Sequence, residues 1–351
     1  MINKKNCKIC GFKNNICIDI NDFFLRIDSS NKNLIDYKNF VCANCGNIFH
    51  YPEISSKKLI KHYQSTYRNT DSMINLKNTH IDLPVKFEWT TNSFHRFYGF
   101  YEMIRDNKII KSKKKISILD YGCYQGAFLY ACKKIFNFRT IGTDFNKEGL
   151  NLAKSIFNVD EVFETKKNFF QKNLNVDIIS LLHVLEHLSD PVDFLIKIKK
   201  KILKTNGLIY IEIPNPFTNP LNDPTHLNLY SIDTIKYLLY SCNYKILSIQ
   251  QRGLYKTGKS LRDNNNLNLH ILAQSENCKE KKFKKIMIGK KVYSKLLRER
   301  RFIGLIIVRR QLKNSLYLMF KTIYSFHLLC VNYFFPNYAV KIHNFFKKIK
   351  K

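Results

Sequence analysis

Two pairs of cysteines near the start of the chain have the spacing of a metal site. Cys7 and Cys10 form one C-x-x-C pair, Cys42 and Cys45 form another, and a glycine follows each pair. A C-x-x-C turn points two thiolates at one ion, and a glycine in the left-handed conformation closes the turn. Four such sulfurs complete a tetrahedral zinc sphere without an open position, which is typical of structural zinc. We therefore expect a zinc ribbon over residues 1–55, with these four cysteines as the zinc ligands.

A second group of residues has the types and order of a nucleotide site. Residues 116–120 predict a buried strand, and Gly122 and Gly126 then lie in a turn that leads into a helix. Glycines in such a turn let the backbone approach a ligand at the carboxyl edge of a parallel sheet. Asp144 ends the next predicted strand, where its two oxygens could accept both hydroxyls of a ribose. A dehydrogenase motif fits less well, because the glycine spacing does not match G-x-G-x-x-G and Asp120 precedes the first glycine.

The elements that must position these groups follow in the order of an α/β sheet. Asp190 is suited to cap a helix, and Pro191 suits the first helical position. Because each apolar run is short and is bounded by turn residues, the runs favour buried strands over helices. We expect further strands at residues 176–182, 207–213, 244–250 and 267–273, the last two as an antiparallel hairpin.

From Ile116 to Gln274 the chain resembles the class I S-adenosylmethionine-dependent methyltransferases. Their first motif is an apolar run followed by D-x-G-x-G-x-G, and Tyr124 stands here where the middle glycine is usual. The segment from Leu185 to Pro191 is similar to their LEH…DP segment. The resemblance implies an α/β fold with a seven-stranded Rossmann-like sheet, a last antiparallel strand, and S-adenosylmethionine as the cofactor. The cofactor-binding residues that it implies are Asp120, Gly122, Cys123, Gly126, Asp144, Phe145 and His183.

His226, Asp223 and His187, which follow the later strands, are the candidates for the chemistry. Methyl transfer from a sulfonium is an in-line displacement, so the enzyme mainly has to hold the acceptor, and a hydroxyl acceptor also needs a base. The loop around His226 resembles one in sugar- and quinone-modifying branches of the family, so His226 is the predicted base, with Asp223 orienting it or helping to bind a cation. Capping of the helix near Ser231 is the alternative role for His226. Glu186 and His187 could hold a divalent ion or clamp the cofactor loop.

The positive charge of the chain is concentrated at its end. The chain has 351 residues and a formal net charge of +32, and residues 279–351 hold 20 Lys or Arg against two acidic residues. Apolar runs alternate with these basic residues, which predicts amphipathic helices that lie on an anionic membrane or on a partner protein. Packing on the methyltransferase domain, with the lysines due to compositional bias, is the alternative. The uncharged run at 322–340 is marginal as a membrane span, because His327, Asn332 and Pro336 interrupt it.

The predicted organisation is a zinc ribbon (1–55), a helical linker (56–115), a methyltransferase domain (116–275) and a basic, mainly helical tail (276–351). The first residues lack the apolar segment of a secretory signal, so we expect a cytoplasmic protein whose tail could lie on the inner face of the membrane. A zinc ribbon before such a domain resembles bacterial enzymes of sugar-nucleotide and surface-polysaccharide biosynthesis. The main hypothesis is therefore methyl transfer to a hydroxyl of a sugar or glycan precursor, a small-molecule acceptor.

Two other functions remain as alternatives. One is an RNA methyltransferase whose ribbon and basic tail hold the RNA, although nucleic acid is the less expected partner because no nucleic-acid module is recognisable. The other is a non-catalytic adapter on the same fold. Methylation of exocyclic base amines and of pyrimidine C5 is not expected, because neither a D/N-P-P-Y motif nor a cysteine follows the strand at 176–182.

Overall fold

The computed structural model describes the N-terminal ribbon and the α/β domain of the chain. The described residues are 6–13, 15–18, 38–65, 91–110, 115–166, 168–218, 223–252, 267–277 and 286–298. They lie almost wholly in the first of two compact units, Met1–Leu296, and most of the second, Leu297–Lys351, lies outside them. The predicted tail beyond residue 298 is therefore not described. Within the described ranges no helix is long and apolar enough to cross a membrane.

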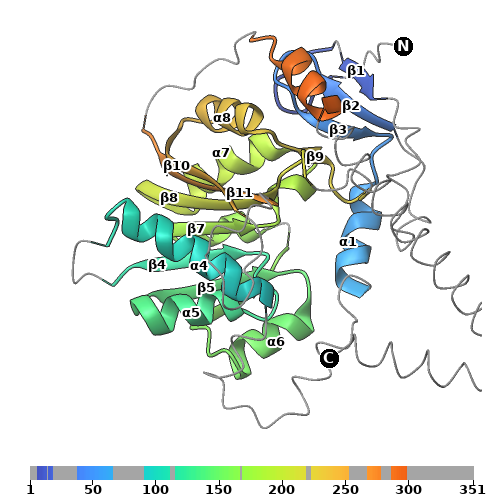
Figure 1. Ribbon diagram of the computed structural model, residues 1–351. Helices are drawn as coiled ribbons and strands as arrows, with labels where there is room; N and C mark the ends of the chain where they lie inside the picture. Colours follow the sequence, from blue (N-terminus) through green and yellow to red (C-terminus); the bar gives the residue numbers. More distant parts are fainter. Residues whose placement is uncertain are drawn as a thin grey trace, which may run out of the picture. The chain divides into compact units, whose positions relative to one another are not determined.

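A seven-stranded sheet forms the centre of the α/β domain (Figure 1). The strands lie in the order β10-β11-β8-β7-β4-β5-β6. All neighbours pair in parallel except β11, which is antiparallel to both β8 and β10. The predicted fold, including the antiparallel last strand, is confirmed. The strands are β4 (Ser117–Tyr121), β5 (Arg139–Asp144), β6 (Glu161–Glu164), β7 (Val176–Leu182), β8 (Leu203–Pro214), β10 (Tyr244–Arg252) and β11 (Asn268–Ser275).

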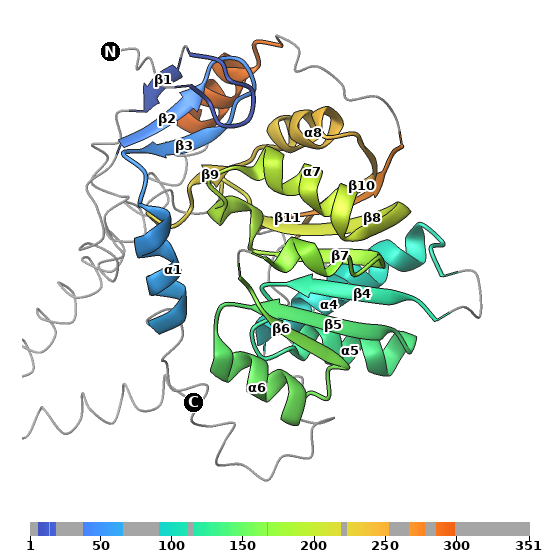
Figure 2. The same ribbon diagram turned by 180° about the vertical axis from the view of Figure 1, so that it is seen from behind.

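Helices cover both faces of this sheet (Figures 1 and 2). The central strands carry apolar side chains on both faces, and each face packs against helices. One face packs against α7 (Pro191–Lys201) and α8 (Ile232–Ser241). The other packs against α4 (Thr91–Asp106), α5 (Ala127–Phe136) and α6 (Lys147–Ser155).

The helix caps agree with the sequence signals. The Asp190 side chain accepts a hydrogen bond from the Asp193 backbone N–H, and Pro191 occupies the start of α7, as predicted. Ser231 caps α8 by accepting from the Thr234 backbone N–H. Because Ser231 does this itself, the alternative in which His226 caps the helix is wrong.

The N-terminal ribbon is a four-stranded antiparallel sheet. Its first three strands are β1 (Asn15–Ile18), β2 (Lys38–Cys42) and β3 (Ile48–Tyr51), and the fourth is β9 (Asn228–Leu229), which comes from the α/β domain. α1 (Ser56–Ser65) follows β3. Residues 286–298 return to the ribbon, where the backbone N–H of Ile288 donates to the Asn44 carbonyl at 2.8 Å. The ribbon is thus completed by segments more than 170 residues away in the sequence.

Candidate active site and metal centre

The four predicted zinc ligands meet at one point of the ribbon. The Sγ atoms of Cys7 and Cys45 are 3.6 Å apart, as are those of Cys10 and Cys42, and all four sulfurs lie within 4.8 Å of one another. Sulfurs at about 2.3 Å from a tetrahedral zinc ion lie about 3.8 Å apart, whereas a disulfide needs about 2.05 Å. The glycine after each pair has φ near +70°, as the turn requires. The donor set and its spacing therefore fit a structural zinc ion.

A cavity of about 320 Å³ lies at the carboxyl ends of β4, β5 and β7, where neighbouring loops leave in opposite directions. This volume is in the range of small-molecule sites, about 300–1,000 Å³. Six of the seven predicted cofactor residues line it, namely Asp120, Gly122, Cys123, Asp144, Phe145 and His183. The seventh, Gly126, lies next to the wall, with φ of +79° and with an added Cβ only 2.7 Å from Val159 Cγ2. The lack of a side chain at Gly126 thus allows the turn to pack closely against Val159.

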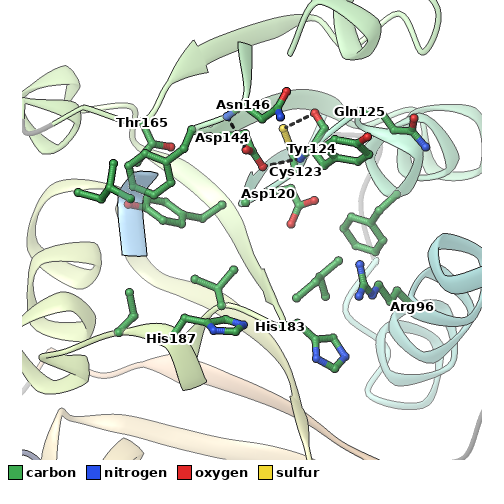
Figure 3. Close-up of a pocket in the computed structure, with 18 of the residues that line it drawn as sticks. Arg96, Asp120, Cys123, Tyr124, Gln125, Asp144, Asn146, Thr165, His183 and His187 are labelled. Carbon is green, nitrogen blue, oxygen red and sulfur yellow. Dashed lines mark hydrogen bonds between the residues drawn. The ribbon is translucent and has the colours of Figure 1, made fainter. Parts of the chain in front are cut away.

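The turn after β4 is fixed by the Asp144 carboxylate. Asp144 Oδ2 accepts from the Tyr124 backbone N–H at 2.7 Å, and its Oδ1 accepts from the Asn146 backbone N–H at 2.8 Å (Figure 3). A carboxylate oxygen can accept more than one hydrogen bond, so both oxygens are suited to accept ribose hydroxyls as well. Tyr124 has φ of +48°, so it adopts the backbone conformation of the glycine that it replaces, and its ring packs against Gly149. The departure from the family motif therefore leaves the loop geometry in place.

Two side chains of the cavity wall have strongly perturbed acidity. Asp120 is buried, and burial raises its pKa to about 7, against the lowering effect of the hydrogen bond that Ser180 Oγ donates at 2.8 Å. Burial also raises the pKa of the Cys123 thiol well above its usual value. Cys123 therefore contributes to packing and is not a thiolate nucleophile, whereas Asp120 changes charge near neutral pH.

His183 lies across the cavity from Asp120 and binds two acids. Its Nδ1 is 3.1 Å from Glu186 Oε1, and its Nε2 is 3.1 Å from Glu212 Oε1. Burial opposes the charged ring, but the bonds to these carboxylates outweigh it and raise the pKa of His183 to about 9. His183 is therefore a cation near neutral pH and is unsuited to act as a base. Arg96 of α4 lines the same side of the cavity, and its Nε lies 3.9 Å from Glu212 Oε1.

The three predicted catalytic residues lie together, but only one of them lines the cavity. His187 does so, with its Nδ1 2.9 Å from the Thr225 carbonyl, and burial lowers its pKa to about 4. The His226 ring lies next to the His187 ring, tilted by 58°, with 4.9 Å between the ring centroids. His226 Nε2 is 3.6 Å from Asp223 Oδ2. Burial works to raise the pKa of Asp223, but His226 and the hydrogen bonds from Thr225 lower it.

The ribbon holds the loop that carries these residues. His50 of β3 has its Nε2 2.9 Å from the Asp223 carbonyl oxygen, and its Nδ1 is 2.6 Å from Asn39 Oδ1. The Asn228 side chain accepts from Asn47 at 2.7 Å and donates to the Leu188 carbonyl at 2.8 Å. Residues of the ribbon therefore position the loop that carries Asp223 and His226 through buried and partly buried hydrogen bonds.

Several residues of the site carried no sequence signal. Arg96 comes from a helix in the predicted linker, and Leu59 and Ile60 of α1 also line the cavity. Glu212 faces the site from the end of β8, where an acid within an apolar strand was the one available hint. His50 stands outside every motif.

Comparisons with known proteins place the α/β domain in a family. Residues 100–249 match a family model described as a methyltransferase domain. A curated relative, the ubiquinone biosynthesis O-methyltransferase of Pelagibacter ubique (strain HTCC1062), is 30% identical over 128 residues. The match covers 32% of this chain and 49% of the relative, so the chain spans about half the length of that protein.

Two solved structures are reported among those similar to this chain. One is an S-adenosylmethionine-dependent methyltransferase from Archaeoglobus fulgidus, with 20% identity, coverage of 51% of this chain and 94% of that one, and a TM-score of 0.38. Another is a putative S-adenosylmethionine-dependent methyltransferase from Listeria monocytogenes, with 15% identity, coverage of 52% and 98%, and a TM-score of 0.39. Residues 100–249 therefore match a methyltransferase domain, and the order of the strands and the glycine turn agree with the fold that the class I resemblance implies.

Proposed function

We propose that this chain transfers a methyl group from S-adenosylmethionine to a hydroxyl of a sugar or glycan precursor. The observation that carries the proposal is one cavity in which the glycine turn and Asp144 face His183 and His187 (Figure 3). One side has the groups that suit a nucleoside, and the other has groups that suit a polar acceptor. The cofactor would supply an electrophilic methyl group on a sulfonium.

The residues around the cavity fit S-adenosylmethionine. Asp144 offers two carboxylate oxygens to a ribose, and the close contact of Gly122 with Val184 leaves no room for a side chain at the turn. Asp120 can supply a negative charge near a sulfonium or an ammonium group, because its carboxyl lies in the same wall. Arg96 and the His183 cation lie on the opposite side, where they could hold an oxygen-rich acceptor.

An oxygen acceptor is favoured by the groups at the far end of the cavity. His187 directs Nδ1 at the Thr225 carbonyl, so Nδ1 carries the proton and Nε2 is the basic nitrogen. His226 and Asp223 lie next to His187 and could assist it in removing a hydroxyl proton. The relative from Pelagibacter ubique is named as an O-methyltransferase, which agrees with oxygen as the acceptor atom.

The ribbon and the tail have supporting roles in this proposal. We propose that Cys7, Cys10, Cys42 and Cys45 hold zinc and thereby fold the ribbon that positions the loop of Asp223. The division into ribbon (1–55), linker (56–115), methyltransferase domain (116–275) and tail (276–351) belongs to the same proposal. Cytoplasmic location and contact of the tail with an anionic membrane surface stay predictions.

Cofactor binding is tested first, by calorimetry with S-adenosylhomocysteine. Asp144→Asn should weaken binding at least tenfold, because it removes the charge and one acceptor next to the ribose. Asp193→Asn, with a half-exposed side chain on α7, serves as the matched control and should bind normally. Absence of binding by the parent protein would refute the proposal.

The acceptor is tested next, with radiolabelled S-adenosylmethionine and a panel of nucleotide sugars, catechols and RNA. Turnover of a nucleotide sugar that is insensitive to salt supports the proposal. Methylation of catechols alone would move the acceptor class to phenols, and a steep salt dependence with RNA would favour the RNA alternative.

A further inference from the structure

The Arg96 guanidinium lines the cavity without a hydrogen bond to any described residue. Its side chain is only 18% exposed, and Figure 3 shows the guanidinium facing the centre of the cavity. Its one ionic contact within the described part of the chain runs from Nε to Glu212 Oε1 at 3.9 Å, which is too long for a hydrogen bond. We propose that Arg96 binds a phosphate or carboxylate group of the acceptor and thereby selects anionic acceptors.

The chemistry of the guanidinium indicates which ligand groups it takes. It carries five N–H donors in a planar fork and keeps its charge at every pH that a protein meets. Water in the cavity can bond these donors, but a carboxylate or phosphate accepts two of them at once and also neutralises the charge. A neutral sugar hydroxyl offers neither advantage. The fork of Arg96 therefore favours an oxyanion over an uncharged polar group.

Glu212 is the nearest acid to Arg96, but the oxygen that faces Arg96 is already bonded elsewhere. Glu212 Oε1 accepts from the Asn268 side-chain amide at 2.8 Å, and it lies 3.1 Å from His183 Nε2. Glu212 thus attracts Arg96 to this end of the cavity without taking up its N–H donors. Those donors remain available to a ligand.

The helix that carries Arg96 is held tightly against the sheet. One turn after Arg96, a Cβ added to Gly99 of α4 would lie 2.8 Å from His270 Nδ1 and 3.0 Å from Tyr210 Oη, so the helix and the strands are in close contact there. Tyr210 Oη also lies 3.4 Å from the Arg96 carbonyl oxygen. Because the helix backbone is fixed at this point, less freedom is lost when the guanidinium binds an anion.

The place of Arg96 along the sheet assigns the anion to the acceptor, an inference that rests on the proposed function. Asp144, which suits the ribose, ends β5, and Glu212 beside Arg96 lies near the end of β8, three strands away. Neighbouring strands are about 4.8 Å apart, so this distance is about 14 Å. Asp120 of β4 lies between the two and suits the positive sulfonium. An acceptor must approach the methyl group from the side away from the sulfur, which is the side of Arg96.

Calorimetry with small anions tests the assignment before the acceptor is known. The full chain, with and without saturating S-adenosylhomocysteine, is titrated at about 0.15 M salt with pyrophosphate and with glucuronate, which present the two kinds of anion. We expect at least one of them to bind, and Arg96→Gln should lower its affinity roughly tenfold or more, because a bidentate charged contact is lost. Arg96→Lys keeps the charge but loses the fork, so its affinity should fall by about 3–10-fold. Arg105→Gln makes the same change at the exposed end of α4 and should leave binding within about twofold.

The outcomes separate the anion site from the proposed function. Equal anion affinity in all variants, or no anion binding by the parent protein at about 10 mM, overturns the inference. So does an Arg96→Gln variant that binds S-adenosylhomocysteine weakly but 5′-methylthioadenosine normally, because the second ligand lacks the carboxylate and Arg96 would then hold the cofactor. Arg96→Lys keeps the test decisive if Arg96→Gln misfolds, which circular dichroism reports. Binding of S-adenosylhomocysteine without anion binding refutes the anion site alone, and the reverse result refutes the proposed function alone.

Discussion

His50→Phe tests whether the ribbon holds the loop that carries Asp223 and His226. Burial lowers the pKa of His50 to about 4, so the ring is neutral near pH 7. Both ring nitrogens face an acceptor oxygen, the Asp223 carbonyl and Asn39 Oδ1, and a neutral ring has only one N–H. When Nε2–H donates to Asp223, the Asn39 amide has to turn so that its NH2 group donates to Nδ1. Phenylalanine keeps most of the ring volume and removes both bonds.

The magnitude follows from the two partners left behind. The Asn39 amide is buried and loses its ring partner, which costs about 1–3 kcal/mol. The Asp223 carbonyl still accepts from the His226 backbone N–H at 3.1 Å, so its loss is near the low end, about 1 kcal/mol. We therefore expect the free energy of unfolding to fall by about 2–4 kcal/mol, part of it as local opening of the loop.

Hydrogen exchange of the His226 amide is the direct assay. A local loss of about 1.4–2.8 kcal/mol makes exchange there about 10–100-fold faster. Affinity for S-adenosylhomocysteine should stay within twofold, because the turn after β4 and Asp144 are not touched. Lys38→Gln, at an exposed position of the ribbon, is the control. Unchanged protection of His226 in a variant that retains zinc would refute the coupling between ribbon and loop.

Three further predictions follow from single contacts. Because burial raises the pKa of Asp120 to about 7, its carboxylate forms as the pH rises from 6 to 8, and calorimetry should show S-adenosylmethionine binding about 3–10-fold more tightly at pH 8. The affinity for S-adenosylhomocysteine, which lacks the sulfonium charge, should change less. In Asp120→Asn the two ligands should show the same change with pH. Gly126→Ala should lower the free energy of unfolding in urea by about 2–5 kcal/mol, since its φ is +79° and the new Cβ would lie 2.7 Å from Val159 Cγ2. Cys42→Ser should abolish the zinc that metal analysis finds in the parent protein and remove exchange protection from Gly46, whose N–H bonds the Cys42 carbonyl.

The sheet could be predicted because its signals are local. Each central strand is a short apolar run bounded by turn residues, and the resemblance to a known family implied how such strands are arranged in the sheet. The completion of the ribbon could not be predicted in this way. β9 has two residues and no periodicity, and residues 286–298 reach the ribbon through a close approach of Gly289 to the backbone of Ala43. Contacts of this kind depend on tertiary structure and leave no pattern in the sequence.

The predicted cofactor-binding residues carry a sequence signal, because the backbone geometry of the turn requires particular residues there. A positive φ at Gly122 and Gly126 favours glycine, and a ribose needs an acid such as Asp144. The acceptor side has no comparable constraint. The prediction of His226 as the base rested on a resemblance, and it remains a prediction, although His187 is the histidine that lines the cavity.

The histidines show why the acceptor side resists prediction from sequence. His183 and His187 are four residues apart, yet the pKa of one is raised to about 9 and that of the other is lowered to about 4. The difference comes from partners: two carboxylates bind His183, one of them from β8, whereas a carbonyl from the following loop binds His187. Because those partners are 29 and 38 residues away, the sequence around the histidines does not specify their charge. The fold therefore makes His183 a cation and leaves His187 neutral near pH 7. A substitution at Glu212 should lower the pKa of His183 although no residue next to His183 in the sequence is changed.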